Sequence, residues 1–199
     1  MKYVWIVCGV GVLLVQAACG AVIYSGPQNI VVSGLYPDVA IDLDEVMPSE
    51  FVFEYTRSSG KTELNITGLA GGGSFFACER LGPFHGPPVR MDAGETVGAE
   101  LLWLSMKDEG LLAGFYETWW GGRFIGQAGY IGVKFELVDG WHFGWIGFEA
   151  KGDASEGLIT GWAFEDVPDQ TIKAGEVPEP TTLAMLVVGW IFLHRRRLC

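Results

Sequence analysis

The stretch YIGVKFELVDGWHFGWIGF, residues 130–148, decides the fold class of this chain. Its first half alternates apolar with polar or glycine residues, so that one face of an extended strand carries Ile131, Val133, Phe135 and Leu137. The pair Asp139-Gly140 follows at once and leads into a second alternating run, residues 141–148. Two runs of period two across an Asp-Gly pair are the strongest short-range signal of a β-hairpin. We therefore expect two antiparallel strands joined by a tight turn.

Further strand candidates lie on both sides of this hairpin. A third run, residues 158–164, follows a polar turn, and earlier candidates are residues 29–32, 40–43, 51–56, 63–67, 74–78 and 101–106. The chain has 29 glycines, and no stretch away from its two ends keeps a helical apolar repeat. Many short strands at close spacing are typical of a sandwich. The sequence predicts an all-β fold over residues 21–176, an antiparallel β-sandwich that is jelly-roll-like.

The first 20 residues have the organisation of a secretory signal. Lys2 precedes an uncharged apolar run that ends in the small residues Ala17 and Ala18. Cleavage after Gly20 or after Ala21 fits this pattern. Cys19 leaves lipidation as an alternative, although Gln16 stands where a lipobox has a Leu-like residue. A permanent membrane helix is a further alternative, which the short length of the apolar run disfavours.

The C-terminus combines three elements in a fixed order. An extended motif comes first, and its residues are Val177, Pro178, Glu179 and Pro180. Residues 183–193 are apolar, and as a helix they would span about 16 Å of a hydrocarbon layer about 30 Å thick. A basic cluster follows, formed by Arg195, Arg196 and Arg197. Such a cluster stops transfer and stays on the cytoplasmic side.

These three elements resemble the PEP-CTERM sorting signal, and the chain is similar to PEP-CTERM proteins also over residues 130–174. The resemblance implies processing near Pro178-Glu179-Pro180 by an exosortase, a membrane enzyme of Gram-negative bacteria. It also implies transient insertion in the inner membrane and delivery to the outer surface or extracellular matrix, often beside exopolysaccharide. Leu198 and Cys199 extend beyond the family's basic tail. The expected organisation is a signal helix (1–20) cut by signal peptidase after Sec export, an extracellular β domain (21–176) and a sorting signal with a short transmembrane helix (177–199).

Charge and cysteine content restrict the function of the middle domain. The whole chain has a formal net charge of −11, and residues 21–177 alone carry about −14. A domain this acidic repels phosphate backbones, which argues against nucleic acid as a partner. Cys78 is the one cysteine between the two end segments, so we expect no internal disulfide and a buried apolar role for Cys78.

The sequence contains no recognisable catalytic or cofactor motif. His85 and His142 have no second His or Cys at the spacing of a zinc site. Residues 59–62, Ser-Gly-Lys-Thr, end like a phosphate-binding loop, but Tyr55 occupies the place of its first glycine, which favours a hairpin turn. We therefore expect a protein without enzymatic activity, bound metal or cofactor.

An acidic stretch near residue 45 partly matches a calcium loop. Asp42, Asp44 and Glu50 match positions 1, 3 and 9, whereas Val46 and Met47 replace a ligand and the glycine of that loop. Weak Ca²⁺ binding and a solvated acidic turn are the alternatives, and the missing positions favour the turn.

Two further hypotheses concern ligands. Trp119 and Trp120 are adjacent and precede two glycines, so exposed rings there could stack on sugars, although tryptophans more often fill a sandwich core. A more distant alternative is a hydrolase that uses the carboxylates of Glu149, Glu165 or Asp166. We expect a non-enzymatic surface protein, with carbohydrate binding as the alternative.

Overall fold

The computed structural model describes residues 20–46, 48–69, 73–81, 84–104 and 110–178. The expected signal helix, Cys19, Glu179, Pro180, the apolar segment 183–193 and Arg195, Arg196 and Arg197 lie outside these ranges. Within them the chain forms strands and turns without a helix. A membrane-crossing helix is therefore not found in this part of the chain.

The described residues form fifteen strands. They are β1 (Val22–Tyr24), β2 (Ile30–Ser33), β3 (Asp38–Ile41), β4 (Phe51–Ser58), β5 (Lys61–Gly68), β6 (Ser74–Leu81), β7 (Phe84–Pro88), β8 (Thr96–Val97), β9 (Trp103–Leu104), β10 (Gly110–Tyr116), β11 (Trp119–Gly121), β12 (Ala128–Leu137), β13 (Gly140–Ala150), β14 (Glu156–Glu165) and β15 (Ile172–Lys173).

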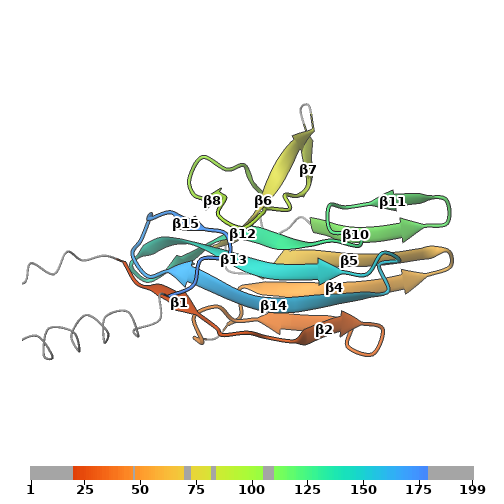
Figure 1. Ribbon diagram of the computed structural model, residues 1–199, viewed down its shortest axis with the longest axis horizontal. Coiled ribbons are helices and arrows are strands. Elements are labelled where there is room, and N and C mark those ends of the chain that lie inside the picture. Colours follow the sequence, from red (N-terminus) through yellow and green to blue (C-terminus); the bar gives the residue numbers. More distant parts are fainter. Residues whose placement is uncertain (1–19, 47, 70–72, 82–83, 105–109, 179–199) are drawn as a thin grey trace, which may run out of the picture.

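Two antiparallel sheets carry the fold (Figure 1). The larger sheet has the order β1-β14-β13-β12-β6-β7, with β2 also paired to β14 and β9 to β6. The smaller sheet has the order β11-β10-β5-β4-β3, and β8 and β15 form a separate two-stranded pair. The expected all-β, sandwich-like fold is confirmed. Consecutive strands pair as meanders within each sheet, β12-β13-β14 in one and β3-β4-β5 in the other.

The predicted hairpin is confirmed as β12 and β13, with its turn one residue earlier than expected. Leu137 pairs with Gly140, so Val138 and Asp139 form the two-residue loop. Gly140 is the first residue of β13 and has a φ of 144°, a value that side-chain-bearing residues rarely adopt. The glycine is therefore required at the start of the strand and not within the turn.

Most other predicted strands are present with shifted bounds. Residues 40–43 were expected to be extended, but β3 ends at Ile41 because the N–H of Leu43 donates to the Glu50 carboxylate instead of to a strand. The expected strand at 101–106 is reduced to β9, and residues 105–109 lie outside the described part. Residues 59–62 form the tight β4-β5 hairpin, as predicted, with Ser58 paired to Lys61.

The main core lies between the two sheets and is rich in phenylalanine. Phe53 on β4 stacks on Phe148 on β13 with ring centroids 5.4 Å apart, and Phe124 meets Phe148 edge-on at 5.5 Å. All three side chains are fully buried, and each such burial stabilises the fold by about 1.5–3 kcal/mol. Because Phe53 and Phe148 come from different sheets, their contact holds the sandwich together.

A second core covers the opposite face of β13. Phe143 and Trp145 are buried there, as their shared alternation predicts, whereas Trp141 is half-buried. Their partners come from the segment before β9, from β14 and from the segment after β14, and include Met91, Val97, Ala163, Ile172 and Ala174. Both faces of the central strand are therefore protected from water.

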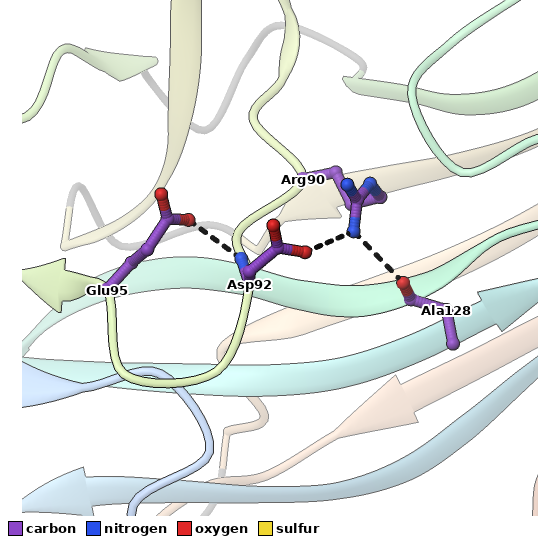
Figure 2. A network of polar contacts seen from close by, with 4 residues as sticks. All are labelled: Arg90, Asp92, Glu95 and Ala128. Atoms are coloured by element: carbon purple, nitrogen blue, oxygen red, sulfur yellow. Dashed lines mark hydrogen bonds and ion pairs between the residues drawn. The ribbon is translucent and has the colours of Figure 1, made fainter.

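A polar network fixes one of these covering segments. Arg90 donates to Asp92 at 2.7 Å and to the carbonyl oxygen of Ala128 at 3.2 Å, while Asp92 N–H donates to Glu95 at 2.7 Å (Figure 2). These contacts close the loop at residues 90–95 against the start of β12. The loop thereby covers the second core with a defined geometry.

The two ends of the described chain leave from the same end of the sandwich. In Figure 1, β1 and β15 lie at the left, whereas the β10-β11 hairpin lies at the right. Every strand and both cores lie between Val22 and Ala174. Residues 21–178 therefore contain all the described strands and both described cores.

Candidate functional site

The chain leaves the domain directly in front of the predicted sorting motif. Trp145 Nε1 donates to the carbonyl oxygen of Glu176 at 3.1 Å, and Glu176 N–H donates to the carbonyl oxygen of Lys173 at 2.9 Å. Val177 follows with 44% of its surface exposed, and Pro178 is exposed as well. The chain is thus fixed through Glu176, and the part of the motif that is described starts at the surface without a linker.

The β10-β11 hairpin presents four aromatic side chains at the other end of the domain. Tyr116 pairs with Trp119, and their rings stack with centroids 3.9 Å apart and planes 10° from parallel. Phe115 pairs with Trp120 at 4.4 Å and 44°. Trp119 and Trp120 are 54% and 52% exposed. The expectation that tryptophans fill the core is therefore wrong for these two rings.

The two tryptophans lie on opposite faces of the hairpin, because successive residues of a strand alternate. Phe115 packs against the main core, so Trp120 stands at the margin of the inner face. Trp119 lies on the outer face, where the paired Gly114 and Gly121 add no side chain beneath the rings. A Cβ at Gly121 would approach the Trp119 ring to 2.9 Å, so this glycine allows the ring to lie close to the sheet.

Polar groups border the stacked rings of Tyr116 and Trp119 on the outer face. Lys61 Nζ lies 5.4 Å from the centroid of the Tyr116 ring and 2.7 Å from a carboxylate oxygen of Glu63. The Tyr116 hydroxyl donates to the other oxygen of that carboxylate, and burial followed by this hydrogen bond raises the Tyr116 pKa well above its ordinary value. An exposed flat ring beside fixed hydrogen-bond donors and acceptors suits a ligand that has an apolar face and several hydroxyl groups. Tyr116, Lys61 and Glu63 were not expected from the sequence, because only strand register brings them together.

The acidic loop brings its three carboxylates together. Ligand oxygens of Asp42, Asp44 and Glu50 all lie within 4.8 Å of one another. Leu43 N–H donates to Glu50 at 2.7 Å, and the buried Asp42 Oδ1 has no hydrogen-bond partner among the described atoms. The carboxylates are less solvated than expected, because Leu43 between them is anchored in the main core. Three oxygen donors could hold a divalent cation weakly, although Ca²⁺ takes six to eight.

Burial shifts the pKa values of the carboxyl groups in this loop. It raises the pKa of Glu50 to about 7, and the nearby Asp44 and Asp42 carboxylates add to the rise. Burial also raises the pKa of Asp44. A folded-state pKa above the unfolded value means that protonated Glu50 stabilises the fold at low pH, and that this stabilisation is lost as the pH rises towards 7.

We expect Glu50→Gln to remove part of the pH dependence of folding. The wild-type free energy of unfolding should fall between pH 5 and pH 8 by about 1–2 kcal/mol more than that of the variant, after allowance for solvent screening. Urea denaturation at several pH values measures this difference. Glu54→Gln is the matched control on β4 and should behave like the wild type because it retains Glu50. Parallel pH profiles of wild type and Glu50→Gln would contradict the assignment.

The carboxylates named for a hydrolase do not form one site. Glu149 is exposed and pairs with Leu158, seven residues before Glu165 on the same strand. That separation is about 23 Å, far beyond the 5–10 Å of a glycosidase pair. Glu165 and Asp166 are sequence neighbours at the end of β14, and Glu165 is 4% exposed.

The remaining reactive side chains have structural surroundings. His142 is buried, with Nδ1 2.7 Å from the Glu165 carbonyl oxygen and Nε2 3.0 Å from Asp139 Oδ1. The hydrogen bond to His142 lowers the pKa of Asp139. Cys78 is a buried free cysteine in the main core, as predicted, and burial raises the pKa of its thiol. The structure describes the backbone of His85 in β7 but not its side chain.

No protein-family model, no curated protein and no solved structure matches this chain. Its function is therefore inferred from its own residues.

Proposed function

We propose that this chain is an exported surface or matrix protein of a Gram-negative bacterium, without catalytic activity, which an exosortase processes at its C-terminal signal. The observation that carries the proposal is the order of the tail, in which an extended motif, a short apolar segment and a basic cluster follow one another. The exposed Val177 supports it, because a processing enzyme can reach a motif that begins at the surface.

The proposal assigns a role to each end segment. Residues 1–20 form a signal helix for Sec export that signal peptidase removes. Residues 177–199 insert transiently into the inner membrane as a short helix that is too brief for a permanent anchor. The strands next to these segments, β1 and β15, lie at the same end of the domain, so one membrane can hold both segments before processing (Figure 1).

Mass spectrometry of the protein from the outer surface and the culture medium tests this proposal. We expect a mature chain that lacks both residues 1–20 and the arginine cluster at 195–197. An intact chain that resides in the inner membrane, with its tail attached, would refute the sorting assignment.

A second candidate function is carbohydrate binding on the outer face of the β10-β11 hairpin. The exposed Trp119 ring, stacked on Tyr116, favours it, because apolar faces of sugar rings stack on such surfaces. The hairpin also lies at the end of the domain away from the chain termini, where a ligand in the surrounding matrix has access (Figure 1). The negative charge of the domain favours neutral over acidic polysaccharides.

Isothermal titration of the purified domain, residues 21–178, against a panel of neutral polysaccharides tests this second function. Saturable binding to one of them supports it. The absence of saturable binding across the panel would leave the domain with a purely structural role at the cell surface.

A further inference from the structure

The first residue after the predicted leader is fixed to the domain by two hydrogen bonds. Ala21 N–H donates to Asp166 Oδ1 at 2.6 Å, and Asp166 N–H donates to the carbonyl oxygen of Ala21 at 3.1 Å. Val22 pairs with Glu165 directly afterwards, at the start of the β1-β14 ladder. Ala21 therefore has a defined position beside a carboxylate before any processing is considered.

The surroundings of this position are acidic and lack a cation. Glu165 is almost fully buried, and Val167 N–H donates to its carboxylate at 3.4 Å. Burial raises the pKa of Glu165 despite the hydrogen bond from the Val167 backbone. A hydrogen bond to Asp166 and the charges of Asp166 and Glu176 raise this pKa further. Among the ion pairs of the described residues, none includes Glu165, Asp166 or Glu176. The end of β14 is thus a site where a positive charge would be stabilised and is not supplied by a side chain.

We propose that the missing charge is the α-ammonium group of Ala21, which removal of the leader after Gly20 creates and which pairs with Asp166. The inference rests on the proposed export, since signal peptidase makes the cut. Water adds its hydroxyl to the Gly20 carbonyl carbon, the Gly20–Ala21 C–N bond breaks, and the released amine takes up protons to become an ammonium. The neutral N–H donor of the precursor is thereby replaced by a charged donor at the same place.

Gly20 packs directly on this acidic site. A Cβ on Gly20 would lie 1.6 Å from Glu165 Oε1, so its backbone lies directly on that carboxylate in the folded domain. Gly20 is half-buried and Ala21 is exposed. The proposed cut therefore places the new charge next to both Glu165 and Asp166.

The ion pair should stabilise the mature form over the unprocessed one. Charged donors make stronger hydrogen bonds than neutral ones, and the β1-β14 pairing has already ordered Ala21. We expect the folding equilibrium constant to be about threefold to tenfold larger with the free terminus, more than for a freely mobile surface pair.

The test compares two forms of the domain that both end at Pro178 and differ only at the N-terminus. One begins at Ala21, released from a fusion by a protease that leaves no extra residue. The other carries the neutral extension Gly-Ser-Gly-Ser in front of Gly20, which moves the ammonium away and keeps the Ala21 amide. Urea denaturation at about pH 6.5, well below the ordinary α-amino pKa of about 8, gives both equilibrium constants. Asp166→Asn should abolish the difference between the forms, whereas Asp38→Asn, an equal charge change on β3, should preserve it.

Equal stability of the two wild-type forms would overturn the inference, as would a difference that survives Asp166→Asn. The wild-type comparison stands even if the Asp166→Asn variant fails to fold. Mass spectrometry of the exported protein separates the two proposals. A retained leader refutes export itself, whereas a mature chain that starts at a residue other than Ala21 refutes only the ion pair.

Discussion

Replacing Pro178, Glu179 and Pro180 together by alanine should leave most of the chain as an uncut precursor in the inner membrane. Proline disfavours a helix, whereas alanine is the strongest helix former. The proposed transmembrane helix could then extend back to Val177, giving 17 residues or roughly 25 Å, a better match to the bilayer. The variant would lose its processing motif and gain a longer anchor. Immunoblotting of inner-membrane, outer-membrane and medium fractions measures the distribution.

A matched control replaces Thr181 and Thr182, the two residues directly after the motif, by alanine. This variant retains both prolines and should be processed and delivered like the wild type. The β domain itself should fold in both variants, because Trp145 and Lys173 hold the chain through Glu176, upstream of either change. Normal surface delivery of the triple-alanine chain would show that the tail is not a PEP-CTERM signal.

Trp119→Ala should weaken polysaccharide binding by about tenfold or more, since a central tryptophan contact commonly contributes about 2 kcal/mol. The loss removes the exposed ring while Tyr116 keeps its hydrogen bond to Glu63. Isothermal titration against the polysaccharide that binds the wild type measures the change. The free energy of unfolding should alter little, because the replaced ring is half-exposed and lies outside both cores.

Trp120→Ala is the control that the structure provides for this experiment. It removes the same side chain from the adjacent residue, with nearly the same exposure, on the opposite face of β11. Binding to the outer face predicts that this variant retains most of the wild-type affinity. An equal loss in both variants, or a loss in Trp120→Ala alone, would contradict the assignment of the ligand to the Trp119 face.

Local sequence patterns predict only part of each candidate site. The exposure of Trp119 could be suspected from the two glycines after Trp120, but its partner Tyr116 depends on the register of β10 against β11. The acidic loop could be matched to a calcium loop by spacing, yet the raised pKa of Glu50 comes from its depth beside the main core. Glu165 and Asp166 stood out in the sequence only as candidate hydrolase carboxylates. The contact between Asp166 and Ala21 gave no signal, because the two residues are separated by 145 positions.

The sequence by itself determined the all-β class, the central hairpin and the burial of Cys78, because alternation and turn residues act over a few positions. It did not predict β10 and β11, which carry Tyr116, Trp119 and Trp120. It also indicates the roles of the two end segments, because their apolar length and charge are local properties that do not depend on tertiary contacts. Tertiary structure alone decided that β13 is covered on both faces, that Trp119 and Trp120 are exposed, and that Asp166 contacts Ala21. These outcomes depend on which distant strands pair and in which register, and the free energy that selects a register comes from burial summed over the whole sandwich.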